Sequence, residues 1–414
     1  MALQPVRGTR DILPEEGARM RHVCATSREA AQRYGYEEIA TPIFEFTGVF
    51  DRTLGEATDV VTKEMYTFDD RNGDSLTLRP EGTAPVARAV VSHGLAQHAP
   101  LKFYYEGPMF RHERPQKGRY RQLHQVGVEL FGVPGPLGDV EVIALGAHIL
   151  QRLGLTEKVR LEINSLGDPE SRTAYRDALV AYLDGHRDNL SAESKTRLER
   201  NPLRILDSKN DADKSIVAAG PRYTDYLNDT SANFFDEVKA RLDDLEVAYQ
   251  VNPRLVRGFD YYCHTAFEFI TDELGAQGTV MAGGRYDGLV QALGGPTLPG
   301  VGWAAGVERL SLLMAEPPAT PRPIAMIPVG EPAAAVVLRL TQELRHLGFT
   351  VDLGFAGNLG RRMKRANKVN ARAAVMIGDD ELAAGTATVR DLDSGEQATA
   401  QLAELAAQLE KYKT

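Results

Sequence analysis

A proline-rich segment near residue 320 constrains the fold most, because the sequence pattern differs on its two sides. Residues 316–323 read EPPATPRP, with four prolines in eight residues. Prolines at this density are typical of a connecting segment. A chain of 414 residues is also too long for one ordinary hydrophobic core. We therefore predict two domains, residues 1–320 and 321–414.

The first domain has the pattern of an α+β protein with an antiparallel sheet and flanking helices. Short stretches of strand character follow one another closely, and the alternation of a Rossmann fold is missing. Strands are predicted at 36–46, 65–68, 75–78, 102–107, 109–111, 123–131 and 255–270, and helices at 15–34, 84–94 and 138–153. Pro42 places the first of these strands at an edge or a junction. Between about 168 and 246 the sequence turns helical and charged, which indicates a helical insertion.

The second domain alternates strands with helices, which predicts a small α/β domain with a partly parallel sheet. Its predicted helix at 361–370 lies in a run of cations that contains no acid. This run includes Arg361, Arg362 and Arg365. A nucleic-acid contact and an ordinary solvated helix face both fit such a run.

The overall composition excludes some classes of protein. The formal net charge is −9, so any contact with nucleic acid must rest on local basic patches. Cys24 and Cys263 form no CxxC pair, which argues against a disulfide framework or a zinc site and fits a reducing compartment. No apolar run approaches the roughly 18 residues of a membrane helix. We expect a cytoplasmic protein that has no bound structural metal and does not enter a membrane.

Residues 110–129, FRHERPQKGRYRQLHQVGVE, combine the groups needed to hold a nucleotide and a polynucleotide end. Arg111 offers a planar fork of donors for a phosphate. Glu113 offers an acceptor for an exocyclic amine. A rim of further cations surrounds Gly118: Arg114, Lys117, Arg119 and Arg121. A hairpin with a solvated, charged tip is the competing interpretation.

Four other segments fit the same chemistry, and two of them carry candidate side chains for substrate binding. In TLRPEGTAPVARA, Glu81 and Thr83 lie where a strand passes into a helix, so they either orient an ammonium group or cap the helix. In LVRGFDYYCHTAFEF, Arg257 precedes a glycine and can approach a ligand. Tyr261 and Tyr262 are predicted to alternate on a strand, so that at most one faces a given pocket.

The remaining glycine-rich segments have two interpretations each. GGRYDGL, at 283–289, is predicted as a tight turn that brings the backbone close to a substrate or merely makes a hairpin. GVGWAAGVERL, at 300–310, is predicted as a thin strand that leads into a helix bearing Arg309. Close packing explains its glycines equally well.

Together these segments resemble one family, the histidyl-tRNA synthetases, which are class II aminoacyl-tRNA synthetases. RGFDYY and GGRYDGL carry the family-specific part of the resemblance, and FRHE and GVGWAAGVERL are shared more broadly within class II. The resemblance extends over nearly the whole chain. It implies a class II catalytic domain with a helical insertion and a C-terminal α/β anticodon-binding domain. It also implies ligation of L-histidine to tRNA(His) through a histidyl-adenylate, with ATP as a substrate, Mg²⁺ as its counter-ion, and a homodimer.

The resemblance assigns roles to individual residues. Arg111 and Arg257 are the expected catalytic residues, which flank the α-phosphate. The expected histidine site consists of Glu81, Thr83, Arg111, Gln125, Glu129, Arg257, Tyr261, Tyr262 and Tyr286. Within it, Glu129 and Tyr262 are expected to read the imidazole nitrogens.

The ATP and tRNA contacts follow from the same resemblance. The expected ATP contacts are Arg111, Glu113, Leu123 and Arg309. The expected tRNA contacts are Lys117, Arg119 and Arg121 at the acceptor end and Arg361, Arg362 and Arg365 at the anticodon stem. The chain departs from the common pattern at Leu123, where many class II enzymes have a phenylalanine. His264, which follows the tyrosines, is expected to face solvent or to support the site without taking part in catalysis.

Two other functions fit part of this pattern. One is a catalytically silent histidine-binding subunit that regulates an ATP phosphoribosyltransferase. Such proteins tend to lose the catalytic arginine and the last domain, and this chain keeps Arg257, Arg111, Arg309 and the residues after the linker. The other is a tRNA-binding scaffold with an inactive site, against which the same arginines argue.

Overall fold

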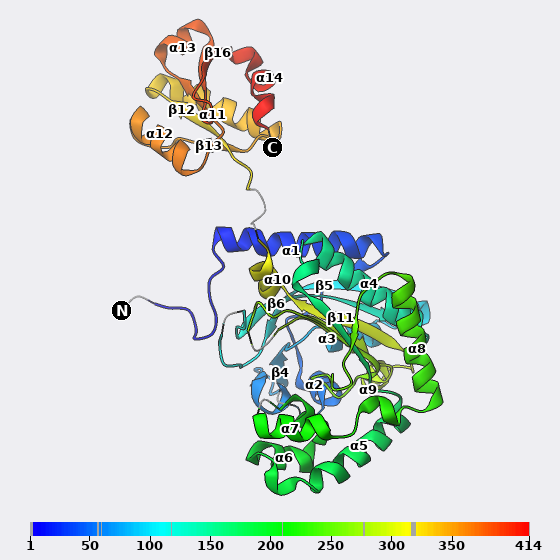
Figure 1. Ribbon diagram of the computed structural model, residues 1–414. Helices are drawn as coiled ribbons and strands as arrows, with labels where there is room; N and C mark the ends of the chain where they lie inside the picture. Colours follow the sequence, from blue (N-terminus) through cyan, green and yellow to red (C-terminus); the bar gives the residue numbers. More distant parts are fainter. Residues whose placement is uncertain are drawn as a thin grey trace. The chain divides into compact units, whose positions relative to one another are not determined.

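The computed structural model describes residues 3–55, 58, 60–116, 118–208, 210–275, 278–315 and 320–413, with only the main chain of Asp207 (Figure 1). The chain divides into two compact units, Met1–Pro317 and Pro318–Thr414. Each unit has its own hydrophobic core. No helix in the described residues is both long and apolar enough to cross a membrane.

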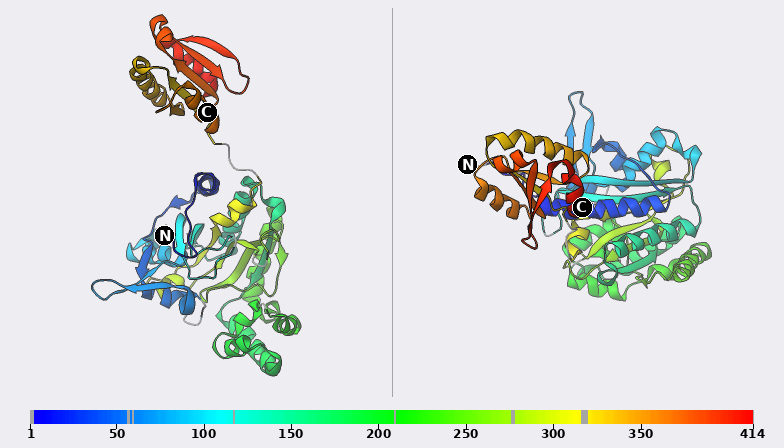
Figure 2. Two further views of the ribbon diagram at one scale, coloured as in Figure 1. Left: turned by 90° about the vertical axis from the view of Figure 1, so that its left-hand side faces the viewer. Right: turned by 90° about the horizontal axis from the view of Figure 1, so that it is seen from above.

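The first unit is organised around an eight-stranded sheet (Figures 1 and 2). In spatial order the strands are β1 (Glu37–Glu38), β5 (Leu101–Phe110), β6 (Gln122–Phe131), β11 (Gly300–Gly306), β10 (Thr279–Arg285), β9 (Cys263–Ile270), β7 (Arg160–Ser165) and β8 (Gln250–Val251). The six central strands pair antiparallel, and only the short edge strands β1 and β8 pair parallel with their neighbours. The antiparallel centre is as predicted.

Helices cover both faces of this sheet. On one face, α1 (Pro14–Arg33), α4 (Pro136–Arg152), α8 (Asp229–Asp244) and α10 (Val307–Leu313) share a buried apolar cluster with the strands. On the other face lie α3 (Thr83–Ser92), α9 (Leu289–Ala292) and part of the insertion. Trp303 of β11 is fully buried on the first face, and its indole N–H donates to the carbonyl oxygen of Val142 at 2.8 Å. The candidate site lies on the second face.

A small three-stranded sheet flanks the large one. It consists of β2 (Phe44–Phe46), β4 (Ser75–Leu78) and β3 (Tyr66–Asp69), next to α2 (Thr47–Leu54) and a short π-helix at Val60–Glu64. The continuous strand predicted at 36–46 is therefore wrong. Pro42 lies in the break between β1 and β2, because its ring removes the N–H that a ladder needs.

The insertion between β7 and β9 is helical. Its helices are α5 (Pro169–Asp184), α6 (Ala192–Arg200), α7 (Asp211–Ala219) and α8, with 3₁₀ turns at Arg187–Asn189, Pro202–Asp207 (η5) and Tyr223–Tyr226. Capping side chains mark the helix starts: Asp168 accepts from Ser171 N at 2.8 Å, and Asn228 accepts from Ser231 N at 2.9 Å. Other 3₁₀ turns of this unit lie at Leu95–His98 and Thr156–Lys158.

The second unit has a five-stranded sheet. The strand order is β13 (Val351–Leu353), β12 (Ile324–Pro328), β14 (Ala373–Ile377), β15 (Thr386–Asp391) and β16 (Gln397–Gln401). The first three strands are parallel and the last two antiparallel, so the sheet is partly parallel as predicted. The helices are α11 (Glu331–His346), α12 (Leu359–Lys368), α13 (Asp379–Ala384) and α14 (Leu405–Leu409), with 3₁₀ turns at Leu402–Glu404 and Glu410–Tyr412.

Candidate active site

A carboxylate caps the helix that opens the site. Glu81 lies between β4 and α3, and its carboxylate oxygens accept from the N–H groups of Thr83 at 2.7 Å and Ala84 at 2.8 Å. The capping interpretation of Glu81 is therefore correct. Burial raises the pKa of Glu81 above its ordinary value, although these N–H groups pull it down. The cap fixes Glu81 beside Thr83, and both side chains are buried.

Glu129 of β6 is the most deeply buried acid of the site, with no exposed surface. The Thr83 hydroxyl donates to its Oε1 at 2.6 Å, and the Tyr286 hydroxyl donates to its Oε2. Burial raises the pKa of Glu129 to about 8, against the lowering effect of the two hydroxyls. Gly302 of β11 lies directly opposite in register, and a Cβ there would collide with the carboxylate. Residue 302 must therefore be a glycine, because any side chain there would collide with Glu129.

The segment 255–262 is a loop, and the strand predicted there begins only at Cys263. Because the loop does not impose alternation, Tyr261 and Tyr262 point the same way: their rings lie 4.5 Å apart and their hydroxyl oxygens 3.5 Å apart. The predicted alternation on a strand is therefore wrong, and of the two rings Tyr262 is the one that lines the pocket beside Arg257. The Tyr262 ring lies 6.3 Å from that of Tyr286, next to the Glu129 carboxylate.

Arg257 reaches the same cluster from the loop. Its guanidinium lies 5.5 Å from the centre of the Tyr262 ring and forms an ion pair with Glu268 of β9. The hydroxyl of Thr279 donates to the second Glu268 oxygen at 2.7 Å. Burial acts to lower the pKa of Arg257, but Glu268 and the tyrosines keep it raised, so this arginine stays charged. Glu268 was not predicted from the sequence, where it is one acid in an apolar strand.

Arg111 follows directly after β5. Its Nε donates to the carbonyl oxygen of Pro80 at 2.8 Å, and its guanidinium lies 5.9 Å from the ring of Phe259. The Phe259 ring is in turn 5.5 Å from that of Tyr261. Arg111 is therefore joined to the tyrosine cluster through one intervening ring.

The basic rim is partly used within the fold. Glu113 is buried and forms an ion pair with Arg119, and it lies 3.9 Å from Arg111. Arg119 is itself half-buried, which lowers its pKa, and its ion pair with Glu113 holds it within the fold. The Arg121 Nε donates to the Glu113 carbonyl oxygen at 3.3 Å. Lys117 lies outside the described residues.

Two predicted contacts lie on β6 and one on α10. Gln125 is buried, and its Oε1 has no hydrogen-bond partner within the described part of the chain. Leu123 lies two residues earlier and is half-buried. The side-chain carbons of Arg309 pack against Gly118 and Gly306, and burial lowers the pKa of Arg309. Gln125 and Leu123 thus lie on the strand that also carries Glu129, whereas Arg309 comes from α10.

The glycine pair of GGRYDGL does not form the predicted tight turn. Gly283 and Gly284 belong to β10, between β9 and β11. A Cβ on Gly284 would lie 2.6 Å from the Thr265 carbonyl oxygen and 2.9 Å from the Tyr262 ring. Glycine is needed here so that the neighbouring strand and Tyr262 can approach closely.

His264 is half-buried and is only partly exposed to solvent. It has a positive φ of 44°, and its ring stacks on Phe234 of the insertion at 4.7 Å. Burial lowers the pKa of His264, so the ring is neutral near pH 7.

The structure therefore connects most of the predicted residues into one cluster. One continuous path of contacts runs from Glu81 through Thr83, Glu129 and Tyr286 to Tyr262 and Arg257. A cluster with buried hydrogen-bonding groups at one end and guanidinium groups at the other can bind a polar ring and an anion side by side.

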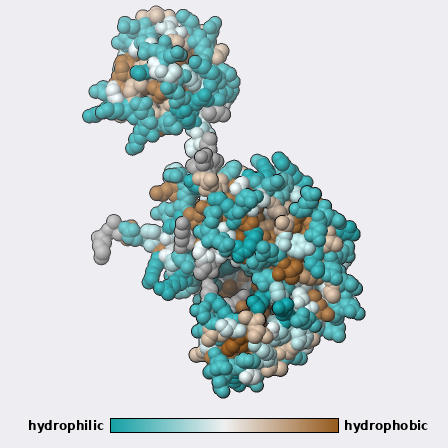
Figure 3. Space-filling model, viewed as in Figure 1, coloured by the Kyte–Doolittle hydropathy of each residue, from teal (hydrophilic) through white to brown (hydrophobic). Residues whose placement is uncertain are grey.

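The cations predicted for the anticodon stem lie on α12. Asn358 caps this helix by accepting from Arg361 N at 3.1 Å. Arg365 forms a two-pronged ion pair with Asp352 at 2.9 and 2.7 Å, and Arg362 donates to the Pro328 carbonyl oxygen. On the face drawn in Figure 3, hydrophilic residues cover most of this unit. Two of the three predicted contacts are thus also used to hold α12 on its sheet.

Two family models match the chain. One, described as histidyl-tRNA synthetase, matches residues 8–310, and one described as an anticodon binding domain matches residues 324–412. The chain is 63% identical over 405 residues to the histidine–tRNA ligase of Rhodospirillum rubrum, with 98% of each chain covered. It is 37% identical to the crystal structure of apo S. aureus histidyl-tRNA synthetase, with a TM-score of 0.82 and coverage of 98% of this chain and 99% of that chain.

A third solved structure shows how widely the fold is shared. It is named as an ATP phosphoribosyltransferase regulatory subunit/histidyl-tRNA synthetase from Bacillus halodurans. It is 22% identical, covers 91% of this chain and 99% of that chain, and has a TM-score of 0.67. At this identity the likeness shows the fold alone.

The first unit has the fold of the class II aminoacyl-tRNA synthetases, and the second is an anticodon-binding domain, so the predicted fold class is confirmed. The chain belongs to the histidyl-tRNA synthetase family. The predicted enzyme class, histidine–tRNA ligase, is confirmed as well, and the regulatory alternative is less well supported.

Proposed function

We propose that this chain joins L-histidine to tRNA(His) in two steps within the pocket around Glu129. Histidine attacks the α-phosphate of ATP to give histidyl-adenylate and pyrophosphate, and the terminal ribose hydroxyl of the tRNA then takes the histidyl group and releases AMP. The observation that carries the proposal is the buried, hydrogen-bonded Glu129 next to Tyr262 and Arg257.

The imidazole ring fits the buried end of the cluster. A carboxylate has about four acceptor positions, and Thr83 and Tyr286 occupy one on each oxygen of Glu129. An imidazole N–H can take a further one, while the Tyr262 hydroxyl serves the other ring nitrogen. An amino acid without such nitrogens leaves these buried groups unpaired, which gives selection of roughly 10⁴-fold or more.

The α-ammonium fits the mouth of the pocket. The Oε1 of Gln125 has no hydrogen-bond partner among the described residues and accepts a hydrogen bond from the ammonium group, and the Glu81 carboxylate has acceptor positions beyond its two capping bonds. Thr83 connects this end of the pocket to Glu129. Tyr261 packs against Tyr262 and closes the side of the histidine site.

Two arginines bind the α-phosphate and stabilise the charge that develops on it during the reaction. Arg111 grips the α-phosphate and the substrate carboxylate, and Arg257 lies on the opposite side, where negative charge grows in the in-line transition state. Arg309, Glu113 and Leu123 hold the rest of ATP. Mg²⁺ enters as the counter-ion of ATP. Among the described residues no group of three or more His, Cys, Asp or Glu side chains is placed to hold a metal.

The partners are tRNA(His) and a second copy of the chain, in the cytoplasm, where tRNA is charged. The rim of Lys117, Arg119 and Arg121 contacts the acceptor end, and α12 contacts the anticodon stem. The segment after Pro42 forms part of the dimer seam. Support for the seam comes from Phe44 and Phe46, which are 48% and 61% exposed.

Exchange of labelled pyrophosphate into ATP, run with each of the twenty amino acids, tests the first step. We expect exchange with histidine alone, followed by transfer to a tRNA(His) transcript. A regulatory subunit or a scaffold gives no exchange with any amino acid. Exchange that depends on another amino acid contradicts the assignment of the imidazole site.

A further inference from the structure

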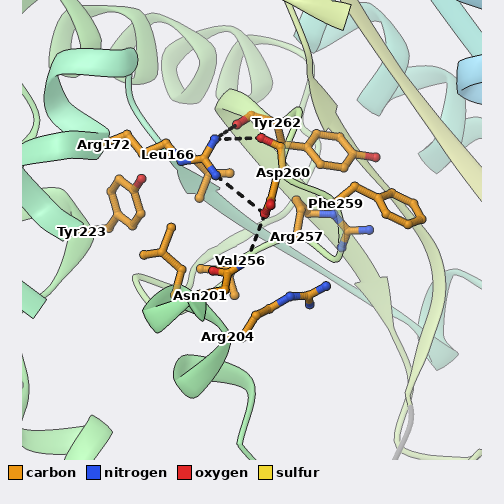
Figure 4. Close-up of a pocket in the computed structure, with 11 residues that line it drawn as sticks. Leu166, Arg172, Asn201, Arg204, Tyr223, Val256, Arg257, Phe259, Asp260 and Tyr262 are labelled. Carbon is orange, nitrogen blue, oxygen red and sulfur yellow. Dashed lines mark hydrogen bonds and ion pairs between the residues drawn. The ribbon is translucent and has the colours of Figure 1, made fainter. Parts of the chain in front are cut away.

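The helical insertion grips the loop that carries Arg257 and the tyrosine pair. The two parts meet across a pocket lined from the insertion by Arg172, Asn201 and Arg204, and from the loop by residues that include Arg257 and Tyr262 (Figure 4). Figure 4 shows the polar groups of the insertion side directed at the loop.

Three insertion side chains donate to oxygens of this loop. Arg172 Nη1 donates to the carbonyl oxygens of Asp260 at 2.8 Å and Tyr262 at 3.3 Å. Arg204 donates to the carbonyl oxygen of Gly258, the residue after Arg257. Asn201 Nδ2 donates to the Asp260 carboxylate at 3.3 Å. The accepting residues are Gly258, which follows Arg257 in the sequence, and Asp260 and Tyr262, which precede and include the tyrosine pair.

The donors themselves are held firmly. Arg204 lies on η5, which packs beside the buried carboxylate of Asp213. This carboxylate accepts from the hydroxyls of Ser191 and Ser194 at 2.7 Å and of Ser208 at 2.6 Å. A fully satisfied buried polar network is rigid, so η5 is a stable base for Arg204.

The loop needs this support because regular pairing does not hold it. Its segment 255–262 lies outside the sheet, and one main-chain bond fastens it to the first unit's α2, from Asp260 N to the Leu54 carbonyl oxygen at 3.3 Å. Gly55, which ends α2, leaves room for the Asp260 side chain, because a Cβ there would collide with it. Misplacing a reacting group by about 1 Å costs on the order of 10²-fold in rate.

We propose that Arg172, Asn201 and Arg204 are positioning residues for histidine activation, so that the insertion sets the geometry of Arg257 and Tyr262. The inference rests on the proposed function of the Glu129 pocket. Arg204 acts mainly through Arg257 and therefore on the chemical step. Arg172 acts mainly through Tyr262 and therefore on histidine binding.

Steady-state pyrophosphate exchange on the full chain separates these effects. We expect Arg204→Ala to lower kcat about 10- to 100-fold with little change in the KM for histidine, and Arg172→Ala to raise that KM about 10-fold. The KM for ATP stays within about 2-fold in both. Arg254→Ala is the matched control, because Arg254 also spans to the insertion, donating to the Ala218 carbonyl oxygen at 2.9 Å, but touches none of these groups. It should leave all three constants unchanged.

A double-mutant cycle with Arg257→Ala distinguishes positioning from general support of the fold. If Arg204 acts through Arg257, adding Arg204→Ala to Arg257→Ala lowers the rate by less than about 3-fold. An unchanged rate in Arg204→Ala, or fully multiplicative losses in the cycle, overturns the inference. If Arg204→Ala does not fold, Arg204→Lys replaces it in the same double-mutant cycle. Lysine keeps the positive charge but lacks the planar guanidinium group. Absence of exchange in the wild-type protein contradicts the proposed function instead.

Discussion

The Glu129 pocket and the basic helix α12 use charge in opposite ways. In the pocket, Glu129 and Glu81 are almost fully buried, and each is held by named hydrogen-bond donors. On α12, Arg361 and Arg365 are exposed, and the pair of Arg365 with Asp352 lies at the surface. A buried charge without a matched partner is costly, so the pocket has little freedom in what it can bind. Each exposed cation contributes little by itself, and its contact with an RNA backbone weakens as the salt concentration rises.

This difference predicts large, specific effects in the pocket and small, salt-dependent effects on α12.

Arg257→Ala should have the largest effect. We expect the rate of adenylate formation to fall by at least about 10²-fold while histidine binding changes little, since the guanidinium matters most when charge grows on the phosphate. Rapid-quench measurement of histidyl-adenylate gives the rate, and calorimetry gives the histidine affinity. Arg254→Ala is the control. An unchanged rate would falsify the role of Arg257.

Glu129→Gln should weaken histidine recognition. The change keeps the shape but replaces one of the two oxygens that accept from the hydroxyls of Thr83 and Tyr286 with an amide NH₂ group, which donates. Leaving a buried partner unpaired corresponds to about 10- to 100-fold in the kcat/KM for histidine. Glu162→Gln on β7 is the control, because Glu162 instead accepts from Asn252 at 2.6 Å. Equal losses in both variants contradict an imidazole contact at Glu129.

The same substitution should change how stability depends on pH. The pKa of Glu129 is raised from an ordinary value of 4.5 to about 8, so between these values the folded protein keeps a proton that the unfolded chain has released. The stability linked to this proton is fully present below pH 4.5 and is lost as the pH rises through 8. The melting temperature of the wild type should therefore fall relative to Glu129→Gln between pH 5 and pH 8.

Tryptophan fluorescence is the suitable probe of this transition. The chain has one tryptophan, and Trp303 is buried in the first unit, so the signal follows that unit alone. Parallel melting curves for the two proteins across this range would show that Glu129 does not titrate there.

Arg361→Ala on α12 should have the smallest effect. We expect a several-fold rise in the Kd for tRNA(His) and a decrease of about one in the slope of log K against log salt, with histidine-dependent exchange unchanged. Filter binding over a salt series measures both. Arg365→Ala, which also breaks the pair with Asp352, serves for comparison, because it should lower the melting temperature of the second unit as well. An unchanged salt slope in Arg361→Ala removes α12 from the tRNA interface.

The sequence was sufficient for the architecture and for the family. Strand and helix patterns predicted the antiparallel sheet, the helical insertion and the partly parallel second sheet, because each depends on local periodicity. The motifs around Glu81, Arg111 and Tyr262 pointed to one pocket, and the structure places these segments together.

The sequence failed where distant contacts decide the local structure. The aromatic run at 255–262 has strand character, yet Arg172 and Arg204, which are 88 and 54 residues away from their acceptors, hold it as a loop. Gly283 and Gly284 look like a turn, but they lie in a strand because close neighbours leave no room for a Cβ. Glu268 carried no signal, since its role comes only from its pairing with Arg257 across the fold.

A crystal structure with a non-hydrolysable histidyl-adenylate analogue tests the central claim most directly. The account predicts that an imidazole nitrogen lies about 3 Å from the Glu129 carboxylate, a distance typical of a hydrogen bond, and that Arg111 and Arg257 lie on opposite sides of the phosphate position. An analogue whose ring binds away from Glu129, or whose phosphate position is contacted by neither arginine, would contradict it.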